Sequence, residues 1–225
     1  MKAGETVNEP NRETSRMEFA DIGPSSGISQ ATAQYTSWGT GVYDFDNDGW
    51  LDILVFHGGL IHLVPQEQSL FRGLGNGKFE DVSREAGPAF DVKTVSRGAC
   101  FADYDNDGKM DAFVVNLGAP ATLLHNVTRN NNHWLTVRLK GNAKPIGRKS
   151  NRDGIGAHVE LLTGGRKQIA ERIAGSGYLS QDDGRIHFGL GSATRAAKIT
   201  IRWPSGQEQV LENQAVDRVL TVEEP

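Results

Sequence analysis

The chain has 225 residues, of which 27 are glycine and 8 are proline, so its sequence is dense in turns. Hydrophobic residues make up 37% and charged residues 23%, which is enough apolar content for a packed core and too much for a disordered chain. The net charge of −4 argues against a nucleic-acid partner held by phosphate contacts, and the single cysteine, Cys100, excludes an internal disulfide framework and a cysteine-rich zinc site.

The amino-terminal stretch is polar and lacks the apolar segment of a secretory signal. We expect residues 1–16 to form a disordered tail. The longest apolar run, Leu51 to Phe56, is far too short for a membrane span, which needs about 20 residues. No membrane-spanning segment is therefore predicted.

Two motifs recur along the chain at nearly the same spacing. The acidic stretch Asp44 to Asp52 returns as Asp103 to Asp111, an offset of 59 residues (103 − 44). The stretch Phe19 to Ile22 is similar to Phe79 to Val82, an offset of 60 residues (79 − 19). Two independent motifs with a shared period indicate a structural repeat. By this repeat, Phe19 to Ile22 is predicted to be the last strand of a preceding unit.

Each repeat unit is predicted to consist of short β-strands. The first unit offers four, at Gly41–Tyr43, Leu51–Phe56, Ser69–Arg72 and Phe79–Val82, with a tight turn at Gly75–Gly77 before the last. The second unit offers three, at Gly98–Ala102, Met110–Asn116 and Ala121–His125. Four strands are the composition of one β-propeller blade. No window has a long helical pattern of apolar residues, so little helix is expected.

The composition changes after Asn126. A polar joint at Asn130–Asn132 precedes longer strands in which apolar and polar residues alternate, at His133–Leu139, Gly156–Leu162, Gln168–Ile173 and Ala197–Trp203. Alternation of this kind, with glycine-containing turns between the strands, predicts a β-sandwich. The predicted fold class is therefore all-β, with propeller blades over residues 17–130 and a carboxy-terminal β-sandwich domain over residues 131–225.

The two acidic stretches follow the pattern Asp-x-Asp-x-Asp-Gly-x-x-Asp, which suits a calcium-binding loop. Ca²⁺ prefers about six to eight oxygen ligands, and a glycine at the sixth position supplies a backbone conformation that other residues resist. Without a cation, four carboxylates this close together would repel one another. We therefore predict two structural Ca²⁺ sites, with side-chain ligands from Asp44, Asp46, Asp48 and Asp52 and from Asp103, Asp105, Asp107 and Asp111, and backbone carbonyl ligands from Trp50 and Lys109.

Alternatives to these calcium sites differ in their ligands. An EF-hand has a glutamate at position twelve and a flanking helix, whereas that position here is Val55 or Val114, within a predicted strand. Mg²⁺ rarely uses a site made only of protein groups. A solvated acidic turn is the remaining alternative, which the matched second copy disfavours.

The same residues carry a resemblance to known repeats. Asp44–Asp52, Asp103–Asp111 and Leu70–Val82 resemble the FG-GAP/VCBS repeats of calcium-binding β-propellers, including integrin α-subunit heads. The carboxy-terminal third is similar to the ASPIC/UnbV domain at Asn151–Ala157, Gly175–Gln181, His187–Gly191 and Trp203–Gly206. The combination resembles the cartilage acidic protein family, which implies an extracellular or cell-envelope location. Because members carry a full propeller, the chain is expected either to be a fragment or to close its blades with a partner.

Two carboxy-terminal segments have both a functional and a structural interpretation. Asn151–Gly154 could bind a polar ligand, or it could form an Asp-Gly turn with an ion pair. Gly175–Gln181 could be a binding loop, or a turn with Tyr178 packed on the core. The sequence suggests no Cys-His pairing and has no Walker loop, so hydrolase and phosphoryl-transfer chemistry have little support and no catalytic residue is assigned.

The predicted function is a calcium-stabilised binding or adhesion module rather than an enzyme. Its partner would be a protein or a glycan, and the open edge of the incomplete propeller predicts self-association. The alternative is an enzyme, or an enzyme fragment, of bacterial secondary metabolism, because some bacterial relatives with the UnbV domain lie in enediyne biosynthesis clusters.

Overall fold

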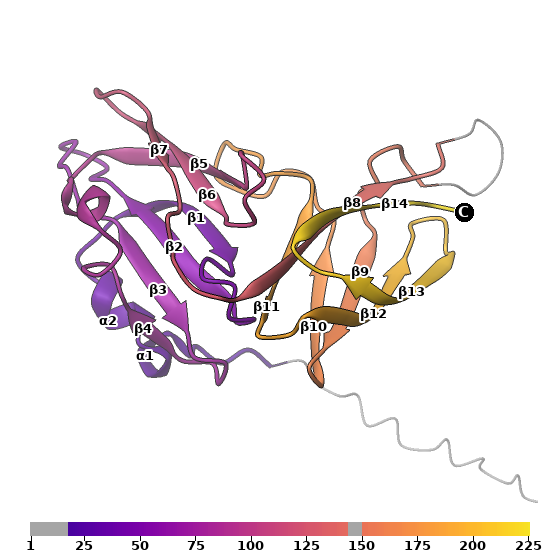
Figure 1. Ribbon diagram of the computed structural model, residues 1–225. Coiled ribbons are helices and arrows are strands. Elements are labelled where there is room, and N and C mark those ends of the chain that lie inside the picture. The colour runs from indigo at the N-terminus through magenta and orange to yellow at the C-terminus, as the bar shows by residue number, and fades with distance from the viewer. Residues whose placement is uncertain (1–17, 144–149) are drawn as a thin grey trace, which may run out of the picture.

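The computed structural model describes residues 18–143 and 150–225, and the tail predicted at residues 1–16 lies outside them. The described residues form an all-β protein with two groups of sheets, coloured indigo to magenta and orange to yellow in Figure 1. The first group consists of two blade-like sheets that do not form a closed ring, so it is a partial propeller. No helix in the described part of the chain is long and apolar enough to cross a membrane.

The first blade is a four-stranded antiparallel sheet with the order β1-β2-β3-β4. Its strands are β1 (Ser37–Tyr43), β2 (Asp52–His57), β3 (Ser69–Gly73) and β4 (Phe79–Asp81). In the turn between β3 and β4, Gly75 and Gly77 have φ angles of +72° and +76°, a region that glycine enters without steric cost. The structure confirms the four predicted strands and the tight turn before the last.

The second blade repeats the first with three strands, β5 (Ser96–Ala102), β6 (Asp111–Asn116) and β7 (Thr122–Leu124). The pairing register repeats as well, because Tyr43 pairs with Asp52 and Ala102 pairs with Asp111. Both β1 and β5 also carry a register shift near their first residue. A short 3-10 helix, η1 (Pro88–Asp91), lies between the blades in the sequence. The predicted repeat is thus a structural repeat.

The two blades pack face to face through an apolar core. Phe56 of the first blade and Phe101 of the second are 1% and 0% exposed, and their ring centroids lie 6.2 Å apart. Gly41 makes room for this contact, because a Cβ atom at that position would lie 2.5 Å from the Phe101 ring. Leu54 and Ala112 belong to the same core.

Two short helices, α1 (Gly23–Ser26) and α2 (Ile28–Thr32), lie beside β3 and β4 of the first blade (Figure 1). Gly27 joins them, and a Cβ atom there would lie 2.7 Å from the Phe79 carbonyl oxygen. Val55 and Phe71, which point away from the second blade, are 6% and 0% exposed. No further α-helix occurs in the residues that the structure describes, so the expectation of little helix is confirmed.

The prediction that Phe19–Ile22 forms the last strand of a preceding blade is wrong. These residues lie outside every described sheet and lead directly into α1, and Phe19 is 98% exposed. A strand needs a neighbouring strand to pair its backbone N–H and C=O groups. Without such a neighbour, the segment is similar to Phe79–Val82 in sequence but not in structure.

The carboxy-terminal part is a β-sandwich of two sheets. One is antiparallel with the order β10-β9-β12-β13 and contains β9 (His158–Thr163), β10 (Arg166–Glu171), β12 (Arg195–Arg202) and β13 (Glu208–Ala215). The other has the order β11-β8-β14 and contains β8 (His133–Lys140), β11 (Ile186–Gly191) and β14 (Arg218–Glu223). Leu135, Leu161, Phe188 and Ile199 bring both sheets into one core and are at most 3% exposed. The boundary predicted at residue 130 falls between β7 and β8.

The sandwich docks on the blades through the segment 174–184. The backbone N–H of Asp183 donates to the Phe101 carbonyl (2.9 Å), and the Phe101 N–H donates to the Asp182 carboxylate (2.9 Å). The Tyr43 hydroxyl donates to the other oxygen of Asp182 (2.8 Å). This segment therefore pairs the Phe101 N–H and C=O groups at the free edge of β5, and Asp182 links that edge to the first blade.

The segments Asn151–Gly154 and Gly175–Gln181, for which the sequence allowed either a binding role or a turn, both take part in turns. Tyr178 is 44% exposed and its ring lies 5.2 Å from the Trp38 ring, so it packs against the first blade rather than in the sandwich core. In the other segment, Arg152 pairs with Asp153 (3.1 Å) and the Asn151 carboxamide oxygen accepts the Ile155 N–H (2.9 Å). The latter arrangement matches the predicted turn with an ion pair.

Candidate metal centre

The first acidic loop joins β1 to β2 and folds around its own aspartates. The Asp44 carboxylate accepts hydrogen bonds from the backbone N–H groups of Asp48 (3.0 Å) and Gly49 (2.7 Å). Gly49 has a φ angle of +90°, which directs the chain back toward β2. Carboxylate oxygens of Asp44, Asp46 and Asp48 lie within 4.8 Å of one another. The loop thus brings three of its four aspartates together.

The fourth aspartate of this loop closes it from a different direction. Asp52 is 3% exposed, and its two carboxylate oxygens accept the backbone N–H groups of Phe45 (2.9 Å) and Gly73 (2.8 Å). Asp52 therefore ties the loop to β3, and the structure does not place it in the group formed by the other three.

The second acidic loop repeats these contacts between β5 and β6. The Asp103 carboxylate accepts the N–H groups of Asp107 (3.1 Å) and Gly108 (3.0 Å), as Asp44 does in the first loop. Carboxylate oxygens of Asp103, Asp105 and Asp107 again lie within 4.8 Å of one another. Asp111 accepts the backbone N–H groups of Tyr104 (3.2 Å) and Asn126 (2.8 Å), which is the role of Asp52.

A histidine distinguishes the second loop. Nδ1 of His125 lies 3.2 Å from the Asp111 carboxylate and 3.9 Å from that of Asp105. The pairing registers place His125 where the first blade has Arg72, which pairs with Glu80 (2.5 Å). Sequence reasoning missed His125 because its partner aspartates, Asp105 and Asp111, lie earlier in the chain, across the β6–β7 pair, and no local pattern links them to it.

Burial of the carboxylates dominates the electrostatics of the first loop. It raises the pKa of Asp44 to about 8 and that of Asp52 to about 7, although hydrogen bonds from backbone N–H groups act in the opposite direction. Burial also raises the pKa of Asp48. Neighbouring aspartates add to each of these shifts. A cation in the loop would remove this penalty.

Two aspartates of the second loop have weaker pKa shifts of the same sign. Burial raises the pKa values of Asp103 and Asp111. Arg185 opposes the shift of Asp103, and His125 opposes that of Asp111. The second loop therefore has basic neighbours that offset part of its negative charge.

The donor set of both loops fits a hard divalent cation. Each group of three aspartates offers carboxylate oxygens, which Ca²⁺ prefers over nitrogen and sulfur ligands. The side chains of Trp50 and Lys109 are not metal ligands. The Trp50 ring packs against the Arg166 guanidinium, and the Lys109 ammonium pairs with the Asp107 carboxylate (2.5 Å). Their carbonyl ligation stays a prediction.

Asn47, at the fourth position of the first loop, was not anticipated as a site residue. It is 5% exposed and has a φ angle of +59°, which asparagine tolerates better than most residues. Its carboxamide N–H donates to the Gly108 carbonyl of the second loop (2.8 Å). Its carboxamide oxygen lies 2.7 Å from Nε2 of His187 in β11, and its backbone carbonyl accepts the Gly191 N–H (2.8 Å). Asn47 thus joins both loops and the sandwich.

Further polar side chains hold the loops against the sandwich. Asn130 and Asn132 both donate to the Asp46 carbonyl, at 2.6 and 2.9 Å. Arg185 donates to the Asp103 carbonyl (2.6 Å) and also contacts Asn106. The asparagine-rich joint was therefore a signal for a contact with the loops, not merely for a connection between domains.

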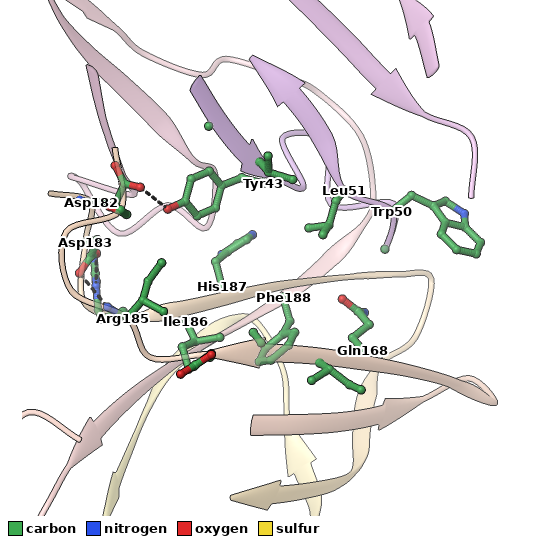
Figure 2. Close-up of a pocket in the computed structure, with 18 of the residues that line it drawn as sticks. Tyr43, Trp50, Leu51, Gln168, Asp182, Asp183, Arg185, Ile186, His187 and Phe188 are labelled. Atoms are coloured by element: carbon green, nitrogen blue, oxygen red, sulfur yellow. Dashed lines mark hydrogen bonds and ion pairs between the residues drawn. The ribbon is translucent and has the colours of Figure 1, made fainter. Parts of the chain in front are cut away.

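A cleft of about 630 Å³ lies between the first blade and the sandwich. Figure 2 shows Tyr43, Trp50 and Leu51 on the blade side, with Gln168, Ile186 and Phe188 on the sandwich side. At one end, the guanidinium of Arg166 lies 3.7 Å from the centroid of the Trp50 ring. The first acidic loop thus forms part of the wall of an interdomain cleft.

Comparison with known families agrees with the two-part fold. A family described as FG-GAP-like repeat matches residues 44–114, which contain both acidic loops. A family described as ASPIC and UnbV matches residues 147–225, within the sandwich. The chain therefore carries both of the elements that the sequence resemblance indicated.

The chain is also similar to a curated animal protein. It is 28% identical over 173 residues to cartilage acidic protein 1 of Homo sapiens, an alignment that covers 73% of this chain and 24% of the relative. It is 29% identical over 174 residues to cartilage acidic protein 1 of Xenopus tropicalis, covering 73% of this chain and 25% of the relative. The chain spans about a quarter of the length of the curated relatives that it matches.

Proposed function

We propose that this chain, which combines an FG-GAP-like repeat with an ASPIC and UnbV segment, is a calcium-binding module for extracellular binding or adhesion. The observation that carries the proposal is the convergence of three carboxylates in each of two equivalent loops. Ca²⁺ would supply the positive charge that these clustered carboxylates lack. Asp44, Asp46 and Asp48 would hold one ion, and Asp103, Asp105 and Asp107 the other.

The contacts of the first loop support a structural role for the ion. Asp46 and Asn47 are hydrogen-bonded to residues of the joint and of the sandwich, so an ordered loop fixes the sandwich against the first blade. The cleft walls come from these two parts. We propose that this cleft, with its mixture of aromatic, apolar and charged side chains, takes a protein or glycan partner.

The proposed extracellular location is supported by the similarity to cartilage acidic protein 1 and by the FG-GAP-like repeat. Because the matched region is about a quarter of those relatives, the proposal concerns the module and not an activity of the whole relative.

Calorimetric titration of chelator-treated protein with CaCl₂, together with thermal melting, tests the calcium proposal. We expect two binding events. Each site would stabilise the fold by about 2.7 kcal/mol at a hundredfold excess over its Kd, which corresponds to a rise in Tm of about 5–10 °C per site for a chain of this size. Asp46→Ala and Asp105→Ala should each remove one event, and the double variant should remove both.

Asp91→Ala is the matched control, because Asp91 is an exposed aspartate outside both loops. It should keep both binding events and the full rise in Tm. A wild-type protein whose Tm is the same in CaCl₂ and in chelator would contradict the proposal.

A further inference from the structure

The two acidic loops are hydrogen-bonded to each other, although they lie 59 residues apart in the chain. The Asn47 carboxamide N–H of the first loop donates to the Gly108 carbonyl of the second (2.8 Å). Asn47 lies between Asp46 and Asp48, two proposed ligands of the first loop. Gly108 directly follows Asp107, a proposed ligand of the second loop. This bond therefore joins the ligand-bearing turn of one loop to that of the other.

A second connection runs through Asn126, which lies just beyond β7. Its carboxamide nitrogen donates to the carbonyls of Phe45 in the first loop (2.8 Å) and of Met110 in the second (3.2 Å). Its backbone N–H donates to the carboxylate of Asp111, the last aspartate of the second loop (2.8 Å). On the other side, the Phe45 N–H donates to Asp52, the last aspartate of the first loop (2.9 Å). Asn126 thus connects the two aspartates that close the loops.

Both connections lie in the interior of the protein. Asn47, Phe45 and Met110 are 5%, 8% and 4% exposed, and Gly108 is also buried. A buried carbonyl that loses its donor costs free energy, because water does not replace the lost hydrogen bond. The bonds of Asn47 and Asn126 form together only when both loops have the conformation described above. The conformation of each loop therefore favours that of the other.

Calcium would act on this linkage through the repulsion between carboxylates. In each loop, oxygens of three carboxylates lie within 4.8 Å of one another, and their repulsion opposes the ordered conformation when no cation is bound. A cation in one loop removes that repulsion and holds the shared bonds in place. The other loop then loses less conformational freedom when it binds its own ion.

We propose that the two loops bind calcium cooperatively, and that Asn47 and Asn126 are the positioning residues that couple them. This coupling depends on the two calcium sites of the proposed function. Linkage is reciprocal, so an ion in either loop raises the affinity of the other loop by the same factor. Repulsion between the two ions opposes this effect, but salt screens it. The coupling should therefore not weaken as the salt concentration rises.

Calorimetric titration with CaCl₂ measures the coupling directly. The coupling factor is the overall association constant for two ions in the wild type, divided by the product of the two single-site constants. Asp105→Ala gives the constant of the first loop alone, and Asp46→Ala gives that of the second. We expect a factor of at least about five in the wild type. Asn126→Ala, introduced into all three proteins, should lower the factor to about two or less, because the bond to Phe45 is lost.

Asn130→Ala is the matched control. The carboxamide oxygens of Asn126 and Asn130 both accept a backbone N–H two residues further along, at 3.0 Å. Among the described residues, however, the Asn130 side chain donates to the Asp46 carbonyl of the first loop and not to the second loop. Asn130→Ala should therefore weaken binding at the first loop and leave the coupling factor at its wild-type value. The factor cancels effects on each loop separately, so a merely structural loss at Asn126 would not change it.

Asn47→Gly is a second variant, because glycine accepts the φ angle of +59° and lacks the bond to Gly108. It decides the question if Asn126→Ala does not fold, as judged by circular dichroism. Two binding events with a factor of one would overturn the coupling and leave the proposed function intact. So would a factor that stays at the wild-type value in each variant that folds. An absence of calcium binding at both loops would overturn the coupling and the proposed function together.

Discussion

The two acidic loops share one sequence pattern and one scheme of backbone hydrogen bonds, yet their surroundings differ. The first loop is covered by the sandwich, and Asn47 at its fourth position is 5% exposed. The second loop is more open, and the side chains of Asp105 and Asp107 are 37% and 31% exposed. Lys109 and His125 pair with aspartates of the second loop, whereas the pairings of the first loop are with backbone groups and the sandwich.

This difference separates what the motif determines from what its environment determines. In both loops the first aspartate bonds the same two backbone N–H groups, so the motif alone sets the local conformation. Burial then raises the carboxylate pKa values most in the first loop, where no lysine or histidine is paired with an aspartate. The first loop should therefore respond more strongly to pH, to cations and to loss of its contacts.

The largest expected effect is a loss of folding stability as the pH rises, in protein kept free of metal ions by a chelator. Asp44 and Asp52 have folded-state pKa values of about 8 and about 7, above the ordinary value of 3.8. Because the folded state holds these protons longer, their contribution is fully present below about pH 4 and is lost as pH rises through 7 and 8. Between pH 6.5 and 8 the free energy of unfolding should fall by about 3 kcal/mol, at about 1.4 kcal/mol per pKa unit.

Denaturant titrations in chelator at a series of pH values measure this slope. The range above pH 6.5 avoids the buried His57 and His187, whose pKa values are lowered from 6.5 to about 4 and whose contribution rises with pH below 6.5. Asp44→Asn should flatten the slope, and Asp103→Asn should flatten it less. Excess CaCl₂ should flatten it in the wild type. If the free energy of unfolding falls with pH at the same slope in the wild type and in Asp44→Asn, the first loop does not cause the loss of stability.

A smaller effect should distinguish Asn47 from Asn106, which occupy the fourth position of the first and the second acidic loop. The two residues should contribute differently to the free energy of unfolding. Asn47→Ala leaves the buried Gly108 carbonyl and Nε2 of His187 without their partner, which should cost about 2 kcal/mol. Asn106 is exposed and contacts Arg185, so Asn106→Ala should cost less than about 1 kcal/mol in lost contacts. The measurement is the difference in unfolding free energy between the two variants.

These two variants are matched in backbone strain. Asn47 and Asn106 have φ angles of +59° and +62°, so alanine is equally disfavoured at both positions and the strain cancels in the difference. If both substitutions cost the same, the buried bonds of Asn47 contribute nothing beyond the loop conformation, and the contrast between the loops would be lost.

The blades could be predicted from sequence because their signals are local and repeated. The Asp-Gly loops and the Gly75–Gly77 turn fix where strands begin and end, and a second copy 59 residues later confirms the unit. The repeat failed at Phe19–Ile22, since a strand also requires a partner outside its own sequence. In the sandwich, the strands β11, β13 and β14 were missed. The apolar residues of β13 are at most half-buried, so no strong alternation marks that strand.

The site was predictable only as far as the loops themselves. Asp44, Asp46 and Asp48 converge through contacts within nine residues, which spacing reveals. The bond between Asn47 and His187 joins positions 140 residues apart, and no pattern in either segment encodes it. Asp52 likewise matched the motif, but its bond from the Gly73 N–H depends on where β3 lies.

The smallest effect concerns the lysine that belongs to the second loop alone. The Lys109 ammonium lies 2.5 Å from the Asp107 carboxylate, so a cation that binds this carboxylate must displace it. Lys109→Gln should therefore tighten Ca²⁺ binding at the second loop, and the exposed pair limits the gain to about 1 kcal/mol, or roughly fivefold in Kd. The measurement is calorimetric titration in an Asp46→Ala background, where the second loop binds alone. Lys78→Gln is the control, since Lys78 lies in the first blade away from Asp107, and it should leave this Kd unchanged. A weaker affinity in Lys109→Gln would mean that the lysine organises the loop for the cation instead of competing with it, and the second loop would then resemble the first in needing its neighbours.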